Sequence, residues 1–71
     1  MQRFGEKLHT LREAHNLSVR QLSTDLGIKS TGYVISLEKG RRYPSIPLLV
    51  KISLYFNVTT DRLVRDDLEL D

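Results

Sequence analysis

The stretch that decides the fold is SVRQLSTDLGIKSTGYVISLEKG, residues 18–40. Ser18 and Gln21 have the spacing of a capping box, in which a serine hydroxyl and a glutamine amide satisfy free N–H groups at a helix start. An apolar helix face then follows at intervals of three and four residues, formed by Val19, Leu22 and Leu26. This pattern predicts a short amphipathic helix that begins at Ser18.

A turn and a second helix follow this first one. Gly27 is suited to the left-handed conformation that closes a helix, and Gly40 ends the next helix in the same way. Ser30 or Thr31 is placed to cap the start of that second helix. Its inward face consists of Val34 and Leu37. The stretch therefore predicts two short helices joined by a tight turn, the second with a short, polar outer side.

Three further helices and no strand are predicted around this pair. The first runs from about Arg3 to His15 and ends at Asn16, a residue that tolerates the left-handed conformation. Its inward face consists of Phe4, Leu8, Leu11 and Ala14. From about Asp66 onward, the chain is expected to fray.

Pro44 and Ser45 predict the start of a fourth helix, because proline is common at helix starts and serine caps them. Asn57 ends it, and its inward face consists of Leu49, Ile52, Ser53 and Phe56. Thr59 then caps a last helix, which directs Leu63 inward.

Composition restricts the classes of function. With 71 residues the chain forms one small domain, which leaves no room for a deep catalytic cleft beside a core. We therefore expect no enzyme, no cofactor and no small-molecule ligand. The absence of cysteine excludes thiolate metal sites, and no apolar run is long enough for a membrane span or signal peptide. A cytoplasmic protein is expected.

Charge is unevenly placed along the chain. Residues 1–60 hold nine basic and four acidic residues, a net charge of +5, whereas residues 61–71 hold two and five, a net charge of −3. The net charge of the whole chain, +2, therefore understates the positive charge of residues 1–60. Such a basic segment favours a negatively charged partner.

The segments LREAHNLSVRQLSTDLGI, GYVISLEKGRRYPS and LLVKISLYFNVTTDRLV together resemble the helix-turn-helix domains of the phage-repressor, Cro and Xre type. The most specific part of the match is formed by Leu37, Glu38, Gly40 and Pro44. The resemblance implies an all-α, compact five-helix bundle of the lambda-repressor type over residues 1–66, followed by an acidic tail at residues 67–71. It also implies a homodimer on double-stranded DNA, with the third helix in the major groove and half-sites roughly 34–36 Å apart.

The resemblance also implies roles for individual residues. Arg12 and Glu38 match a buried ion pair that joins the first helix to the end of the third; the alternative is two solvated charges. The positions that match base contacts are Thr31, Gly32, Tyr33 and Ser36. Two alternatives stay open: Thr31 is only a cap, and Tyr33 is only a half-buried ring. The interval from Gly27 to Glu38 is one residue longer than in the commonest members, which leaves two registers open for residues 29–36.

Phosphate contacts require only charge, amide groups and reach. The expected set is Ser18, Arg20, Gln21, Lys29, Lys39, Arg41, Arg42 and Tyr43. The run KGRRY would be an ordinary solvated surface in an arbitrary protein, but beside this motif it indicates nucleic acid. Alternatively, Arg41 or Arg42 enters a narrow minor groove.

Two smaller features complete the sequence-based expectations. His9 and His15 are six residues apart, so they do not share a helix face, and no metal site is expected. A second apolar strip, made of Ile46, Val50 and Leu54, is either core or a partner surface, and we favour core. The expected dimer interface is the corner between the last two helices, formed by Asn57, Thr60 and Leu63.

The sequence therefore predicts a sequence-specific DNA-binding transcriptional regulator, and among these a repressor that occupies an inverted-repeat operator. The alternative is a protein-interaction adaptor or antitoxin-like module that uses the same fold to bind a protein partner.

Overall fold

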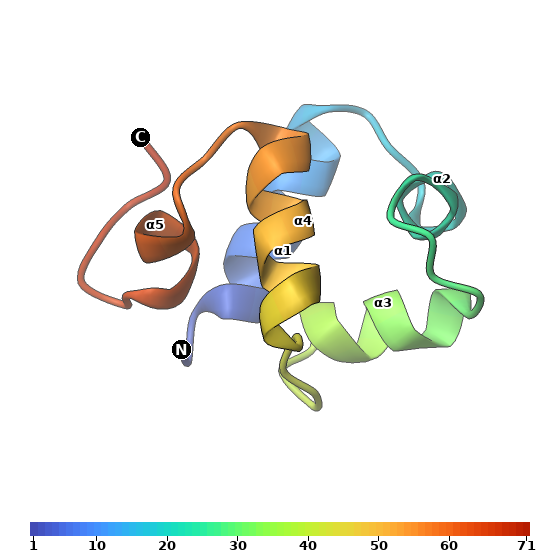
Figure 1. Cartoon of the computed structure of the whole chain (residues 1–71), viewed down its shortest axis with the longest axis horizontal. Helices are drawn as coiled ribbons and strands as arrows, with labels where there is room; N and C mark the ends of the chain where they lie inside the picture. Colours follow the sequence, from blue (N-terminus) through green and yellow to red (C-terminus); the bar gives the residue numbers. More distant parts are fainter.

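The computed structural model describes residues 1–71 and contains five α-helices and no strand, so the predicted all-α class is confirmed. The elements are α1 (Phe4–Ala14), α2 (Val19–Asp25), α3 (Thr31–Glu38), α4 (Ile46–Phe56) and α5 (Thr60–Val64). Figure 1 shows α5 and both termini at one end of the molecule and α2 at the other. The third helix starts beneath α2 and runs along the lower edge toward the middle of the molecule. The second helix and the start of α3 thus lie away from the termini, whereas the end of α3 lies beside the start of α1.

The ends of four segments have the left-handed backbone that the sequence predicts. The φ angle is 55° at Asn16, 72° at Gly27, 75° at Gly40 and 55° at Asn57. A positive φ is strained for most residues with a side chain, and glycine and asparagine tolerate it best. These residues therefore set where the chain turns between helices.

Three helices begin with a side-chain cap. The hydroxyls of Ser18, Ser45 and Thr59 each accept a hydrogen bond from the backbone N–H three residues later. The prediction that the side-chain amide of Gln21 also satisfies a free N–H group at this helix start is wrong, because that amide donates to Asp25 Oδ1 at 2.7 Å instead. Ser30 occupies the capping position of α3, but neither its hydroxyl nor that of Thr31 caps the helix. Both hydroxyls therefore stay available.

A single core joins the helices. Its ten residues are Phe4, Leu8, Leu11, Leu22, Leu26, Val34, Leu37, Ile52, Phe56 and Leu63. Ala14, predicted to face inward, is exposed instead, because α1 ends there, one turn beyond Leu11 at the edge of the core. Near the other end of α1, Gly5 lies directly against the last carbonyl groups of α3. This close crossing was not predicted from the sequence.

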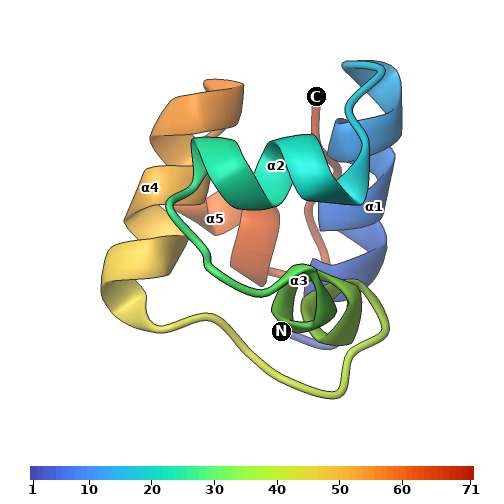
Figure 2. The ribbon, with the colours of Figure 1, turned by 90° about the vertical axis from the view of Figure 1, so that its right-hand side faces the viewer.

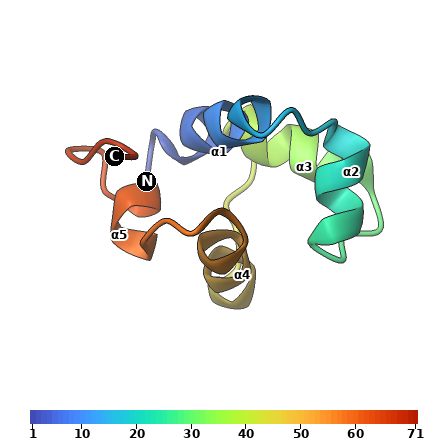
Figure 3. The same cartoon turned by 90° about the horizontal axis from the view of Figure 1, so that it is seen from above.

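The apolar strip on α4 is on the surface, so its assignment to the core was wrong. Ile46 is 77% exposed and Leu54 is 76% exposed, with Val50 between them also exposed. Figure 3 shows the reason: α4 lies at the lower edge of the molecule in that view, with no element beyond it. Only the opposite face of α4, which carries Ile52 and Phe56, reaches the core.

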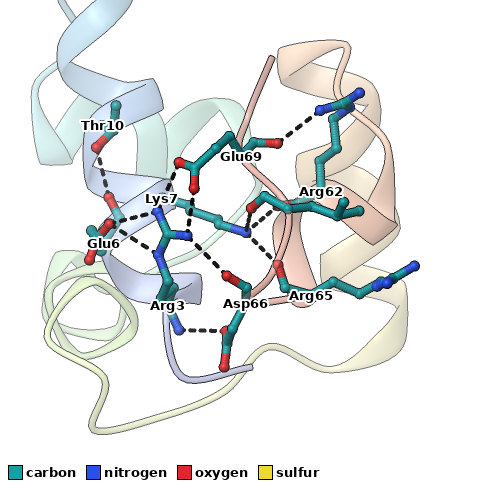
Figure 4. Close-up of polar contacts among 9 residues, drawn as sticks. Arg3, Glu6, Lys7, Thr10, Arg62, Arg65, Asp66 and Glu69 are labelled. Atoms are coloured by element: carbon teal, nitrogen blue, oxygen red, sulfur yellow. Dashed lines mark hydrogen bonds and ion pairs between the residues drawn. The ribbon is translucent and has the colours of Figure 1, made fainter.

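The acidic segment from Asp66 to the C-terminus, called the tail from here on, packs against the start of the chain, contrary to the expectation that it frays. The carboxylate of Asp66 accepts hydrogen bonds from the backbone N–H groups of Gln2 and Arg3, at 3.0 and 2.9 Å. The guanidinium of Arg3 donates to both carboxylate oxygens of Glu69, at 3.0 and 3.1 Å. Figure 4 shows the contacts of Arg3 with Asp66 and Glu69 side by side. Opposite charges from the two ends of the chain therefore hold the tail in place.

A buried lysine reinforces this contact. Lys7 is 2% exposed, and its Nζ donates to the carbonyl oxygens of Arg62, Arg65 and Leu68 at 2.6, 2.7 and 2.7 Å. A buried ammonium requires such partners, and the last carbonyl groups of a helix have none within the helix. Lys7 therefore satisfies the end of α5 and holds the first residues of the tail (Figure 4).

Candidate nucleic-acid interface

The second and third helices cross at one end of the molecule. Figure 2 shows α2 running across the view with α3 seen end-on below it. Their turn is fixed by α4: Lys51 Nζ donates to the carbonyl oxygen of Leu26 at 3.1 Å, and the Tyr55 hydroxyl donates to Asp25. The hydrogen bond to Asp25 raises the pKa of Tyr55. These contacts hold the end of α2 and the start of the turn against α4.

The end of α3 is tied to α1 by the pair that the resemblance implied. Arg12 Nε lies 2.6 Å from Glu38 Oε2, and Arg12 Nη2 lies 3.2 Å from Glu38 Oε1. The side chains are only 13% and 9% exposed. Burial alone would raise the pKa of Glu38, but hydrogen bonds from Arg12 and His9 lower it overall. The same pairing raises the pKa of Arg12.

The outer side of α3 carries short side chains around a shallow hollow. The hollow has a volume of about 370 Å³ and is lined by Ser30, Gly32, Tyr33, Ser36 and Arg42. Three of the four residues expected to contact bases therefore lie together. Thr31 is exposed but does not line the hollow. Ile35, also on α3, lies instead in a groove between α1 and α3.

The loop after α3 folds back toward this helix. The backbone N–H groups of Arg41 and Arg42 both donate to the carbonyl oxygen of Ser36, at 2.9 and 3.4 Å. The guanidinium carbon of Arg42 lies 5.9 Å from the centroid of the Tyr33 ring. The presence of both Ser30 and Arg42 in the hollow was not predicted from the sequence. The signal in the sequence was the chain reversal at Gly40, which returns the next residues toward α3.

The eleven basic residues divide into two groups. Six have partners within the chain: acidic side chains or backbone carbonyls accept hydrogen bonds from Arg3, Lys7, Arg12, Lys51, Arg62 and Arg65. The other five are exposed, and no ion pair or side-chain hydrogen bond engages them: Arg20, Lys29, Lys39, Arg41 and Arg42. These five are the basic members of the set expected to contact phosphate. They lie in α2, in the turn before α3 and in the loop after it.

The three uncharged members of the same set lie on the same part of the chain. Ser18 and Gln21 are exposed at the start of α2, although the Ser18 hydroxyl already accepts the N–H of Gln21 at 3.0 Å. Tyr43 is exposed in the loop after α3. Anions at this surface would meet positive charge and polar groups without a nearby carboxylate from the tail, which lies at the opposite end (Figure 1).

The corner expected to form a dimer interface is only partly available. Asn57 is exposed and Thr60 is half-buried, but Leu63 is 0% exposed and belongs to the core. Leu63 therefore has no surface to offer a second copy, and its place in the expected interface is corrected to a core position.

The histidines have structural partners. His9 Nδ1 lies 3.0 Å from Glu38 Oε1, and His15 packs edge-on against Phe56 with ring centroids 5.0 Å apart. No group of three or more metal-ligating side chains is present.

Two crossed helices joined by a left-handed turn, with unpaired cations on both sides of the second, define a helix-turn-helix domain. The chain belongs to the helix-turn-helix family, whose sequence pattern matches residues 8–63. This confirms the resemblance stated from the sequence. The family places the chain among DNA-binding modules and not among enzymes.

Several relatives are similar to most of the chain. It is 39% identical over 61 residues to the HTH-type transcriptional activator BcrR of Enterococcus faecalis, and 39% identical over 51 residues to the HTH-type transcriptional repressor RghR of Bacillus subtilis. These alignments cover 86% and 72% of this chain but only 29% and 37% of those proteins. An uncharacterised HTH-type transcriptional regulator of Methanocaldococcus jannaschii is 40% identical, over 73% of this chain and 77% of its own length.

Solved structures show the same fold. The N-terminal DNA-binding domain of SinR from Bacillus subtilis superposes with a TM-score of 0.82 at 24% identity, over 97% of this chain and 100% of that domain. A transcriptional regulator from Listeria innocua gives a TM-score of 0.82 at 29% identity, over 96% of this chain and 63% of its own. None of the helices has the length and apolar character needed to cross a membrane.

Proposed function

We propose that this chain binds double-stranded DNA sequence-specifically as part of a transcription regulator, with α3 as the recognition helix in the major groove. The observation that carries the proposal is the distribution of unpaired cations: all five lie in α2 or in the segments on either side of α3. Elsewhere in the fold, every basic side chain has a partner. Cations without internal partners are available to neutralise phosphates.

The proposal assigns two roles to the residues of this surface. Base edges are read from α3 by Thr31, Gly32, Tyr33 and Ser36. Phosphates are contacted by Ser18, Arg20, Gln21, Lys29, Lys39, Arg41, Arg42 and Tyr43. Contacts to phosphate set the position of the domain on the duplex, whereas contacts to base edges distinguish sequences.

We further propose a repressor that acts as a homodimer on an inverted repeat. Occupying an operator requires only the DNA surface described above, and one relative is named a repressor while another is named an activator. The exposed Asn57 and the half-buried Thr60 at the α4–α5 corner are the residues we assign to the dimer contact. Two copies related by a two-fold axis would present two recognition helices about one DNA turn apart.

Selection of bound duplexes from a random pool tests the DNA-binding function and its symmetry together. An enriched inverted repeat, bound with a steep salt dependence, is the expected result. Equal binding of selected and random duplexes would overturn sequence-specific recognition. Enrichment of a single half-site without a repeat would overturn only the homodimer, and a reporter placed behind the selected site distinguishes repression from activation.

One observation favours a second candidate function, a module that binds a protein partner. The strip of Ile46, Val50 and Leu54 on α4 is exposed, and it lies outside the DNA surface. If this function were the principal one, Leu54→Asp would abolish activity in cells, while Ser36→Ala and Arg42→Ala would leave it intact. The DNA-binding proposal predicts the opposite for the latter two variants.

A further inference from the structure

The recognition helix lacks the side chains that distinguish bases best. Two hydrogen bonds to one base edge are usually made by arginine or lysine to guanine, or by asparagine or glutamine to adenine. The sequence of α3 is TGYVISLE, and it contains none of these four residue types. Serine and threonine hydroxyls contact several bases with little preference. A strong base contact from this surface must therefore come from a residue outside α3.

Arg42 is a residue outside α3 that the fold places beside the outer side of this helix. The loop returns along α3 through the hydrogen bonds to Ser36, and Arg42 then lines the same hollow as Gly32 and Ser36. Its guanidinium lies over the Tyr33 ring, within the range of a cation–π contact. Arg41 donates its N–H to the same carbonyl group but does not line the hollow.

The guanidinium of Arg42 also has its full donor capacity available. It makes no ion pair, and its side chain makes no hydrogen bond within the chain. Contact with the half-buried Tyr33 ring restricts where the flexible side chain lies without using any of its five N–H donors. Gly32 has no side chain to fill the space beside it, and a Cβ there would meet only Ser30 Oγ, at 3.4 Å.

We propose that Arg42 reads a guanine in the major groove, donating two N–H groups to its O6 and N7 atoms, and that Tyr33 is a positioning residue for Arg42. This inference rests on the proposed function. It changes the role given to Arg42 from phosphate contact to base contact, and the role given to Tyr33 from base contact to positioning. The hollow beside Gly32 leaves room for the edge of the base. Specificity at one base pair of each half-site then depends on a loop residue held against the recognition helix.

The test uses the full chain and the duplex selected by the wild-type protein. Lysine can contact guanine, but Arg42→Lys loses both the planar fork and its stacking on the Tyr33 ring, which holds the side chain in place. We therefore expect affinity for the selected duplex to fall about 10- to 100-fold. Affinity for random duplex and its salt dependence should stay the same. Selection with this variant should lose a guanine preference at one position of each half-site. Arg41→Lys is the matched control and should keep that preference.

Modified DNA identifies the contacted atom. Replacing the guanine at that position with 7-deazaguanine removes the N7 acceptor, so it should weaken binding by the wild-type protein and leave the Arg42→Lys variant unaffected. For the positioning role, Tyr33→Phe keeps the ring and should retain the preference, whereas Tyr33→Leu should reduce it while circular dichroism shows an unchanged helical fold.

Each outcome decides the matter. If the wild type discriminates between duplexes but Arg42→Lys keeps the same guanine preference, the inference is overturned and the proposed function stands. If the wild type does not discriminate between duplexes, the proposed function is overturned and this inference with it. If Tyr33→Leu keeps the full preference, only the role of Tyr33 is overturned.

Discussion

Gly5 in α1 lies so close to the end of α3 that a Cβ atom on it would be 2.5 Å from the carbonyl oxygen of Glu38. The same atom would lie 2.5 Å from the carbonyl oxygen of Leu37. Both neighbours are backbone atoms at the end of α3, so neither can move aside without shifting that helix. The spacing between α1 and α3 therefore depends on the absence of a side chain at residue 5.

Gly5→Ala is expected to destabilise the fold by about 1–3 kcal/mol, because overpacking forces the backbone of a packed core to shift. Chemical denaturation monitored by circular dichroism measures the change. Gly32→Ala is the matched control within a helix: its Cβ has room, so alanine should leave stability unchanged or raise it by up to about 1 kcal/mol. Equal stability of Gly5→Ala and the wild type would contradict the close crossing.

Breaking the Arg12–Glu38 pair should cost more than its replacement by two apolar residues. Glu38→Gln leaves the guanidinium of Arg12 largely buried without a counter-charge, and we expect a loss of about 3 kcal/mol in the free energy of unfolding. The double variant Arg12→Met with Glu38→Leu should regain much of that loss. Urea denaturation at pH 7 compares the three proteins, and a double variant less stable than Glu38→Gln would contradict a desolvated pair.

The same pair predicts a pH dependence. Hydrogen bonds from Arg12 and His9 hold the pKa of Glu38 below its usual value of 4.5 in the folded chain, despite the opposing effect of burial. A carboxyl group with a lowered pKa stabilises the fold above the unfolded value and loses that contribution as the pH falls through the folded value. The stability difference between wild type and Glu38→Gln should therefore be constant near neutrality and shrink below about pH 4.5. An unchanged difference in acid would show that Glu38 does not titrate as described.

Lys7 should control the order of the tail. Lys7→Met removes the ammonium that satisfies three carbonyl groups, so residues 65–71 should lose protection against amide hydrogen exchange. Global stability should fall by about 2 kcal/mol, because buried acceptors lose their partner. The control is Lys51→Met, since Lys51 is exposed and donates to one carbonyl group only. Unchanged exchange in the tail would show that Lys7 does not hold it.

A cation that contacts phosphate should contribute the same binding free energy whatever the DNA sequence. Lys39→Ala or Arg41→Ala should weaken binding to selected and random duplexes by the same factor, and each should reduce the salt slope by about 0.9. Fluorescence anisotropy at several salt concentrations measures both quantities. Arg65→Ala is the control, because Arg65 pairs with Asp67 near the opposite end. A variant that changes only the preferred sequence would contradict a phosphate role.

Local signals in the sequence were sufficient to predict the five helices and the residues near which they begin and end. The hydroxyls of Ser18, Ser45 and Thr59 each cap a helix through an N–H group three residues later. Gly27 and Asn57 adopt the left-handed conformation because of their own residue type. Such effects depend on neighbours in the sequence, so they are visible without a structure.

Contacts between distant residues were not predictable in this way. Lys7 contacts Leu68 and Gly5 contacts Glu38 only after the chain has folded. The exposure of Leu54 likewise depends on which elements cover α4, and spacing alone does not distinguish a second buried face from an uncovered one. At the DNA surface, the basic residues were visible in the sequence, but the placement of Arg42 depended on the path of the loop after Gly40.

The separation of charges described above also affects the approach to DNA. Unpaired cations lie in and around α2 and α3, while the carboxylates of the tail lie at the other end of a molecule only 30 Å long. Such a molecule has an electric dipole, and the field of a phosphate backbone exerts a torque on it before any atoms touch. We therefore expect the domain to turn with α3 toward the duplex during diffusion. A larger share of its collisions then begins in a productive orientation.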